Sequence, residues 1–186
     1  MVAKDDLWEV AVDQHGFVAT ADARDLGIAS HTLKLLGQRG VLERRGHGVY
    51  RFARFPESAA DEYQQAVLWT GQPRATLSHE TALDRLDLCD VNPDHIDVTV
   101  PAGARVRRQG GEGIRLHEED IAPADVMWWE GIRCVNERTA IRQVISGQRT
   151  QAHLIRQAIE TARARGRITV DEARRFTEEI GVASGA

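Results

Sequence analysis

The hydrophobic pattern of the first 55 residues predicts three short helices. Apolar positions recur at helical spacing in three runs, which cover residues 5–15, 20–26 and 30–38. Thr20 and Ser30 stand at the start of the second and third runs, where we expect them to act as N-caps. Gly27 separates these two helices, and Leu33, Leu35 and Leu36 form the apolar side of the third. Two capped helices joined by a tight turn are typical of a helix-turn-helix.

Three short apolar runs in the same segment predict strands, at residues 17–19, 41–42 and 49–52. The last two flank Arg44-Arg45-Gly46-His47-Gly48, which we interpret as a basic hairpin. The first is expected to pair with this hairpin. A helix-turn-helix followed directly by a basic hairpin is a winged helix, so residues 1–55 are predicted to be a winged helix-turn-helix domain.

The rest of the chain predicts a connecting helix in residues 56–73 and a second domain in residues 74–186. Ser58-x-x-Asp61 is expected to cap the connecting helix, which Gly71 ends. The second domain is expected to hold helices at 78–86, 139–145, 152–165 and 169–180, strands at 96–100, 114–116, 126–129 and 132–135, and a frayed tail at 181–186. The predicted fold class is α+β, an N-terminal winged helix-turn-helix followed by a small mixed α/β C-terminal domain.

The charge of the chain favours a nucleic-acid partner only locally. The 186 residues carry 24 Lys and Arg against 28 Asp and Glu, a net charge of −4. Any attraction to DNA must therefore come from a local patch. The cations of residues 24–54 are Arg24, Lys34, Arg39, Arg44, Arg45, Arg51 and Arg54, against Asp25 and Glu43. This patch favours duplex DNA binding; the alternative is a protein-docking winged helix whose arginines are solvated charges.

The DNA-binding interpretation gives each exposed polar residue of this segment a role. The candidate DNA-binding residues are Ser30, His31, Thr32, Lys34, Gln38, Arg39, Arg44, Arg45, His47, Arg51, Arg105, Arg107 and Arg108. Thr32, Lys34 and Gln38 are expected to face the major groove, with Ser30 and His31 near a phosphate. Arg44, Arg45 and His47 are expected to reach the backbone or the minor groove. The cluster at 105–108 is either a second phosphate-contacting patch or a mobile solvated loop.

Motifs of catalysis and metal binding are incomplete. His79-Glu80 begins like a zinc-peptidase signature, but Leu83 stands where the second histidine is needed. The acidic run His117–Asp120 is typical of a solvated turn, and no glycine-rich phosphate loop precedes a helix. Ser58 and Ser78 are better explained as caps than as nucleophiles. No lysine follows the wing, which argues against a metal-dependent nuclease. We expect no enzyme, no metal and no cofactor.

Cysteine usage and hydropathy indicate a compartment. Cys89 and Cys134 are isolated in the sequence and are expected to be free thiols. No signal peptide and no membrane-spanning run are visible. The predicted location is the cytoplasm, with no membrane partner.

A series of sequence landmarks runs along the chain, namely Gly48-Val-Tyr-Arg-Phe52, Leu77-Ser-His-Glu-Thr-Ala-Leu83, Ile96-Asp-Val-Thr-Val-Pro101, Leu116-His117 and Gly131-Ile-Arg-Cys-Val-Asn-Glu-Arg-Thr139. Together, these landmarks resemble the AbiEi antitoxin family of bacterial toxin–antitoxin and abortive-infection operons. The resemblance implies a winged domain that binds inverted repeats in its own promoter and represses transcription. It also implies that residues 74–186, an antitoxin C-terminal domain, antagonise a cognate nucleotidyltransferase toxin.

Three interpretations remain open at this point. The chain is either both repressor and antitoxin, or an interaction protein that acts only as a toxin antagonist, through the exposed faces of the helices at 152–165 and 169–180. An orphan winged-helix regulator is the other alternative.

Overall fold

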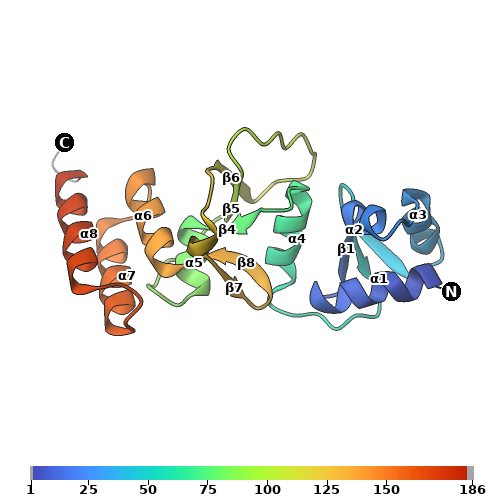
Figure 1. Ribbon diagram of the computed structural model, residues 1–186, viewed down its shortest axis with the longest axis horizontal. Coiled ribbons are helices and arrows are strands. Elements are labelled where there is room, and N and C mark those ends of the chain that lie inside the picture. The colour runs from blue at the N-terminus through green and yellow to red at the C-terminus, as the bar shows by residue number, and fades with distance from the viewer. Residues whose placement is uncertain (1, 184–186) are drawn as a thin grey trace. The chain divides into compact units, whose positions relative to one another are not determined.

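The structure, a computed structural model, describes residues 2–183 of a mixed α/β chain (Figure 1). Its contacts divide it into two compact units. Unit 1 comprises Met1–Ala75, Gly103–Glu112 and Glu130–Ile132, and unit 2 comprises Thr76–Ala102, Gly113–Trp129 and Arg133–Ala186. The α+β class is therefore confirmed, whereas the domain boundaries at residues 55 and 73 stay a prediction.

Unit 1 has the element order of a winged helix followed by one more helix. Its elements are α1 (Val2–Asp13), β1 (Phe17–Ala19), α2 (Thr20–Asp25), α3 (Ser30–Gln38), β2 (Leu42–Gly46), β3 (Val49–Phe52) and α4 (Asp61–Thr70). The strands form an antiparallel sheet in the order β1-β3-β2. Phe17 lies opposite Arg51, which confirms that the first strand pairs with the wing. β3 is therefore the central strand.

The core of unit 1 is made by one side of each helix. Leu7 of α1, Ala23 of α2 and Leu33 of α3 are completely buried against Val18 of β1 and their neighbours. Spacing at i and i+3 puts Leu36 on the same side of α3 as Leu33, and it is 8% exposed. Leu35 is 42% exposed, so its predicted place on the apolar side of α3 was wrong.

The predicted N-caps of α2 and α3 lie one residue too late. Ala19 and Ala29 are the N-cap residues, and Ser30 is already the first helical residue, with no cap bond from its side chain. At α2 the cap bond comes instead from Asp22, whose carboxylate accepts the backbone N–H of Ala19 at 2.7 Å. Thr20 donates its hydroxyl to the Gly48 carbonyl at 3.2 Å. Thr20 therefore connects α2 to the wing.

Helix α4 begins three residues after its predicted cap. Ala60 is the N-cap residue, and the Ser58 hydroxyl donates to the Asp61 carboxylate at 2.7 Å and accepts the N–H of Ala60 at 3.3 Å. Gly71 ends the helix as predicted, in the left-handed conformation with φ of 66°.

Unit 2 combines a mixed sheet with four helices. Its elements are β4 (Thr76–Leu77), α5 (His79–Arg85), β5 (Ile96–Val100), β6 (Ile114–Glu118), the short 3₁₀ helix η1 (Pro123–Asp125), β7 (Val126–Trp129), β8 (Ile132–Val135), α6 (Glu137–Gly147), α7 (Ala152–Ala164) and α8 (Val170–Ala183). The strand order is β6-β5-β4-β8-β7. β5 runs antiparallel to β4 and parallel to β6. The two-residue strand β4 and η1 are too short to show in the hydrophobic pattern and were not predicted.

Helices α6, α7 and α8 pack side by side, and α5 packs against α6 (Figure 1). Ile141 of α6, Ile155 and Ile159 of α7 and Phe176 of α8 are buried among them. The predicted capping box of α8 is confirmed, since the Thr169 hydroxyl accepts from the Glu172 N–H at 3.2 Å while the Glu172 carboxylate accepts from the Thr169 N–H at 2.7 Å. α8 continues past the predicted end at Ile180, and the rest of the predicted tail, residues 184–186, lies outside the described residues.

No helix of residues 2–183 combines the length and the apolar character needed to cross a bilayer.

Candidate nucleic-acid interface

Helix α3 presents a polar face to solvent because its two buried leucines fix its rotation. Leu33 and Leu36 hold one side of the helix in the core. Four of the predicted recognition residues are exposed on α3, namely Ser30, His31, Lys34 and Gln38, and Thr32 is half-buried. The arrangement leaves hydroxyl, imidazole, ammonium and amide groups free to meet base edges.

Arg39 follows the last residue of α3 and is exposed. It lines a groove of about 520 Å³ together with Lys4 and Trp8 of α1 and Arg54. Arg39 therefore lies beside the N-terminal helix as well as at the end of the recognition helix.

The wing turns at His47 and Gly48. Gly46 pairs with Val49, so only these two residues form the turn, and Gly48 has the positive φ of 70° that favours glycine there. We expected Arg44 and Arg45 in the connection of the hairpin, but both lie on strand β2. The register shifts between Arg44 and Gly46, which gives a β-bulge at Arg45. Both arginine side chains are exposed, and Arg45 lies 2.9 Å from Glu43 in a partly exposed ion pair.

Arg51 is buried within unit 1, although we expected it to contact DNA. Only 3% of it is exposed, and its guanidinium forms an ion pair with Asp61 of α4 at 2.8 Å. Two more of its bonds go to the carbonyls of Phe55 and Pro56, at 3.1 and 2.7 Å. β3 is the central strand and all four of its residues are buried. A cation in this strand needs internal partners, and Arg51 is consequently unavailable to a phosphate.

Arg108 connects the basic loop Gly103–Glu112 to the rest of unit 1. Its guanidinium donates to the carbonyls of His47 and Trp69, at 3.1 and 2.8 Å. The Trp69 indole in turn donates to the Gln109 carbonyl at 3.0 Å. Burial lowers the pKa of Arg108 from its ordinary value. Arg108 is therefore a structural residue, whereas Arg105 and Arg107 of the same loop are exposed.

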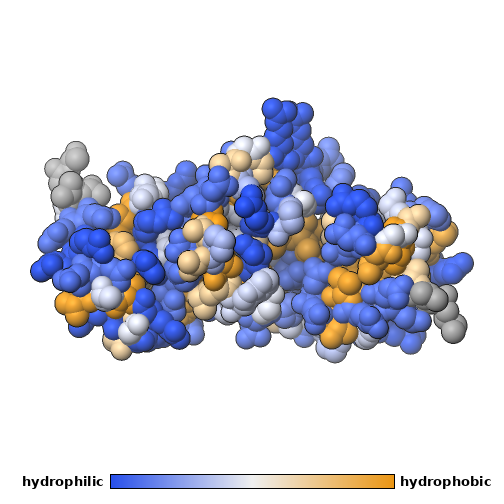
Figure 2. Space-filling model, viewed as in Figure 1, coloured by the Kyte–Doolittle hydropathy of each residue, from blue (hydrophilic) through white to orange (hydrophobic). Residues whose placement is uncertain are grey.

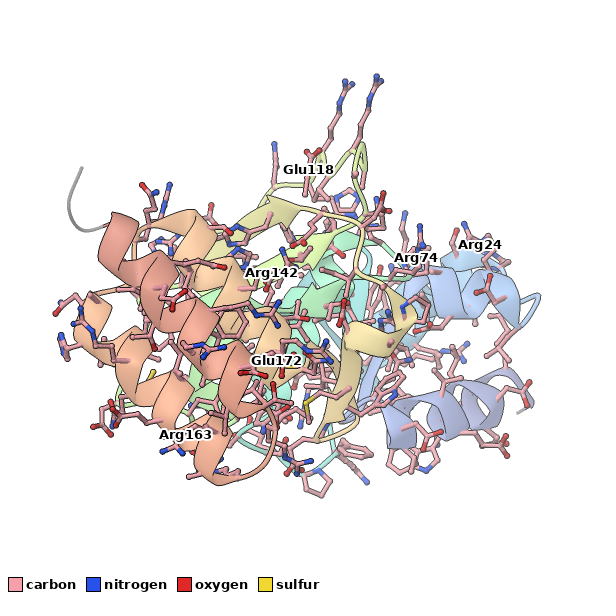
Figure 3. The ribbon with its side chains drawn as sticks, turned by 60° about the vertical axis from the view of Figure 1, so that its left-hand side comes forward. Arg24, Arg74, Glu118, Arg142, Arg163 and Glu172 are labelled. Atoms are coloured by element: carbon pink, nitrogen blue, oxygen red, sulfur yellow. The ribbon has the colours of Figure 1, made fainter. Side chains whose placement is uncertain are left out.

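The exposed cations of unit 1 give the candidate interface its charge. Arg44, Lys34 and Arg39 are exposed on the wing and at α3, and the loop adds Arg105 and Arg107. Arg24 on α2 is outward in Figure 3 but lies 3.4 Å from Asp25, so its charge is partly neutralised. Figure 2 shows a strongly hydrophilic surface where the loop between β5 and β6 reaches the top of the view. This set of cations suits phosphate contacts.

The comparison with known families agrees with this geometry. Residues 5–53 match the family described as "Transcriptional regulator, AbiEi antitoxin". The AbiEi match runs from within α1 through β1, α2 and α3 to the end of the wing, and of the landmarks it includes Gly48–Phe52.

The chain is similar to a structure titled "Crystal structure of RV2827C protein from Mycobacterium tuberculosis", with 13% identity and a TM-score of 0.49, over 97% of this chain and 78% of that chain. No curated protein matches the chain.

Outside the AbiEi match, unit 2 holds a cluster of polar side chains that the sequence analysis did not assemble. The rings of His79 on α5 and His117 on β6 are stacked, with their centroids 3.5 Å apart and their planes inclined by 15°. Asp97 of β5, which is 1% exposed, lies 2.8 Å from Nε2 of His117 through Oδ1. We call His79, His117 and Asp97 the imidazole cluster. The parallel pairing of β5 with β6 puts Thr99 opposite His117 and so brings His117 close to Asp97. No local sequence pattern predicts this proximity.

The remaining candidate groups are metal ligands and cysteine thiols. No group of three or more His, Cys, Asp or Glu side chains within residues 2–183 is arranged to hold a metal ion. Cys89 and Cys134 are free thiols, as predicted. Burial raises the pKa of Cys134 to about 12 and also raises that of Cys89. Both thiols therefore stay protonated at neutral pH.

Proposed function

We propose that the chain is a DNA-binding transcriptional autorepressor and antitoxin of the cytoplasm. It binds inverted repeats in its own promoter and neutralises a cognate nucleotidyltransferase toxin. The observation that carries the proposal is the exposed polar face of α3 beside the cationic wing, within the segment that matches the AbiEi regulators. A regulator with this layout reads DNA with one helix and positions itself with the wing.

The proposed complex places α3 in the major groove. Thr32, Lys34 and Gln38 read base edges, while Ser30 and His31 lie at the helix N-terminus, where backbone N–H groups favour a phosphate. Arg44, Arg45 and His47 of the wing contact the backbone or the minor groove. Arg51 and Arg108 are left out of this contact set because their guanidinium groups are engaged within unit 1.

Inverted repeats imply that two copies of the chain bind one operator. Each copy then contacts one half-site, and the half-sites are separated by one helical turn of DNA or a multiple of it, about 10 base pairs. Arg39 and the exposed loop arginines, Arg105 and Arg107, are candidates for phosphate contacts beside each half-site.

Toxin neutralisation is proposed to use unit 2. The outer faces of α7 and α8 carry exposed charged residues, among them Arg156, Arg163, Arg174 and Glu178. These faces are polar enough to remain solvated when the partner is absent, as the surface of a transient interface must. A chain that serves only as a toxin antagonist, with a winged helix that docks protein, is the alternative function.

A fluorescence-anisotropy titration against the chain's own upstream DNA tests the repressor half of the proposal. The protein, an Arg44→Ala/Arg45→Ala variant and an Arg163→Ala/Arg174→Ala control are each titrated with this duplex and with an unrelated one. Promoter-selective binding that only the wing variant loses supports the proposal. Equal affinity for both duplexes would overturn it and leave the antagonist function.

The antitoxin half is tested in cells that express the neighbouring toxin gene. Co-expression of the full chain is expected to restore growth, and the wing variant is expected to restore it equally, since it leaves unit 2 unchanged. Failure of the unaltered chain to restore growth would contradict toxin neutralisation without affecting the DNA result.

A further inference from the structure

A cavity of about 170 Å³ opens beside the imidazole cluster in unit 2. Its lining comes from α5, β5, β6, α6 and the loop between α6 and α7. The charged groups in this lining are Glu80, Asp97, Arg115 and Arg149, and both imidazoles of the cluster also border it. All of these belong to unit 2 and are separate from the candidate nucleic-acid interface.

Each imidazole of the cluster has one ring nitrogen engaged and one available. His117 uses Nε2 for the buried carboxylate of Asp97, and His79 uses Nδ1 for the Ser78 hydroxyl at 3.0 Å. Within residues 2–183, no second hydrogen bond is found for either ring. The remaining nitrogens, Nδ1 of His117 and Nε2 of His79, are therefore free to meet a ligand.

The backbone of His79 supports a functional role for this position. Its φ is 51°, in the left-handed region that a non-glycine residue rarely adopts. The Gln143 side chain of α6 accepts the His79 N–H at 3.2 Å and holds this conformation. Strained backbone of this kind is concentrated at binding and catalytic sites.

The two arginines of the cavity differ in how firmly they are held. Nη1 of Arg115 lies 3.7 Å from Asp97, and its Nη2 lies 3.0 Å from Nδ1 of His95, so this guanidinium is fixed in the wall. Arg149 is exposed in the loop after α6, and no ion pair to it is found among the described residues. An engaged and an exposed guanidinium thus border one cavity, and each has N–H groups that suit the oxygens of an oxyanion.

Each carboxylate of the cavity has a partner on at least one oxygen, whereas one ring nitrogen of each imidazole and the Arg149 guanidinium have none among the described residues. Oδ1 of Asp97 faces both His117 and Arg115, while its Oδ2 is buried with no hydrogen-bond partner. Glu80 accepts the Thr150 hydroxyl at 2.7 Å. Apart from the buried Oδ2 of Asp97, the unused capacity of the cavity lies in imidazole and guanidinium N–H groups, which bind an acceptor-rich anion.

We propose that this cavity binds a phosphate-type anion, either free phosphate or the phosphate group of a small molecule, and that binding is accompanied by proton uptake at His79. Arg149 and Arg115 contact the oxygens of the anion from the loop and the sheet. Nε2 of His79 donates from the stack. This site is independent of the DNA-binding and antitoxin functions proposed above.

Proton uptake follows from the charges around the stack. The charged groups around it are Glu80 from α5, Asp97 from β5, Arg115 from β6, Glu119 after β6, Arg142 from α6 and Arg149 from the loop after α6. Burial and the neighbouring His117 lower the pKa of His79 to about 4, so in the empty cavity His79 is neutral at pH 7. An anion stabilises the protonated ring and raises this pKa again. By linkage, the affinity for the anion must increase as the pH falls.

The test follows the imidazole ¹⁵N resonances of the full chain during titration with anions. Sulfate is the first probe, because its charge does not change between pH 6 and pH 8. We expect a saturable shift of both His79 and His117, and a Kd at pH 8 at least about threefold higher than at pH 6. Inorganic phosphate and glycerol 3-phosphate, compared at one pH, distinguish a free anion from a phosphate ester. The tighter of the two identifies the source.

Three variants make the test specific. Arg149→Ala is expected to weaken sulfate binding about tenfold. Arg156→Ala, which removes an exposed arginine of α7, is the matched control and is expected to leave Kd unchanged. His79→Asn tolerates the left-handed backbone and is expected to abolish the pH dependence while the chain stays folded. Absence of a saturable shift, equal effects of the two arginine variants, or a Kd independent of pH would each overturn the proposal.

Discussion

The guanidinium of Arg51 lies 2.8 Å from the carboxylate of Asp61, and this ion pair connects the central strand of the wing to α4. The two side chains are 3% and 20% exposed. Because the pair is nearly dry, removing one partner leaves a charge with little solvent to stabilise it. The cationic segment 24–54 thus contributes exposed charges to the surface of unit 1 and, through Arg51, an ion pair inside it.

Replacing Asp61 by Ala is expected to lower the free energy of unfolding by about 3 kcal/mol, because Arg51 then stays buried without its counter-ion. The matched control is Asp171→Ala on α8, whose ion pair with Arg174 is 3.0 Å long but has side chains that are 78% and 69% exposed. An exposed pair of this kind contributes roughly 0.5 kcal/mol. Urea unfolding measures both variants, and equal losses would contradict the structural role of Arg51.

Single substitutions at the wing are expected to change the salt dependence of DNA binding. Arg44→Ala removes one exposed guanidinium, so the slope of log K against log salt should fall by about one for every duplex tested. Arg51→Lys is a contrasting variant, since its buried side chain makes no DNA contact in the proposed complex and the slope should stay unchanged. Anisotropy titrations at several salt concentrations measure both slopes, and a smaller slope for Arg51→Lys in a folded protein would refute this contact set.

Local sequence patterns were sufficient to predict that α3 and the wing exist. The spacing of Leu33 and Leu36, three residues apart, specifies which face of α3 is buried, and Gly48 marks the turn of the wing. The environment of Arg51 was not predictable, since its burial depends on β1 pairing with β3 and on α4 packing against the sheet. The contact between His79 and His117 was not predictable for the same reason, since it depends on tertiary structure. Their stacking is a consequence of the strand order, and neither residue has a neighbouring motif that indicates the other.

The attachment of the basic loop is expected to depend on a glycine. A Cβ atom at Gly111 would lie 2.4 Å from the Trp69 ring, so Gly111→Ala must displace the loop or the indole. The hydrogen bond from Trp69 to Gln109 is then expected to be lost, with a shift of the Trp69 indole N–H resonance and faster proteolysis of the loop. Gly147→Ala is the control, because a Cβ there meets no atom within 4 Å. Identical spectra for the two variants would show that Trp69 does not hold the loop.

The imidazole cluster is expected to make unit 2 less stable in mild acid. Burial, and next the charge of His117, lower the pKa of His79 from 6.5 to about 4, so between these values the unfolded chain binds a proton that the folded chain does not. The His79 contribution to stability is therefore fully present above pH 6.5 and is lost as the pH falls toward 4, by about 2 kcal/mol for a partly exposed ring.

Carboxylates also titrate in acid, so the measurement is the difference between the unaltered chain and His79→Asn in urea unfolding from pH 4 to pH 8. The variant should lose less stability across this range, because its side chain takes up no proton on unfolding. Added sulfate should reduce the loss in the unaltered chain, since a bound anion stabilises the protonated ring in the folded state. Parallel curves for the two proteins would mean that His79 is not held neutral by its neighbours, and would remove the physical basis for a proton-linked anion site.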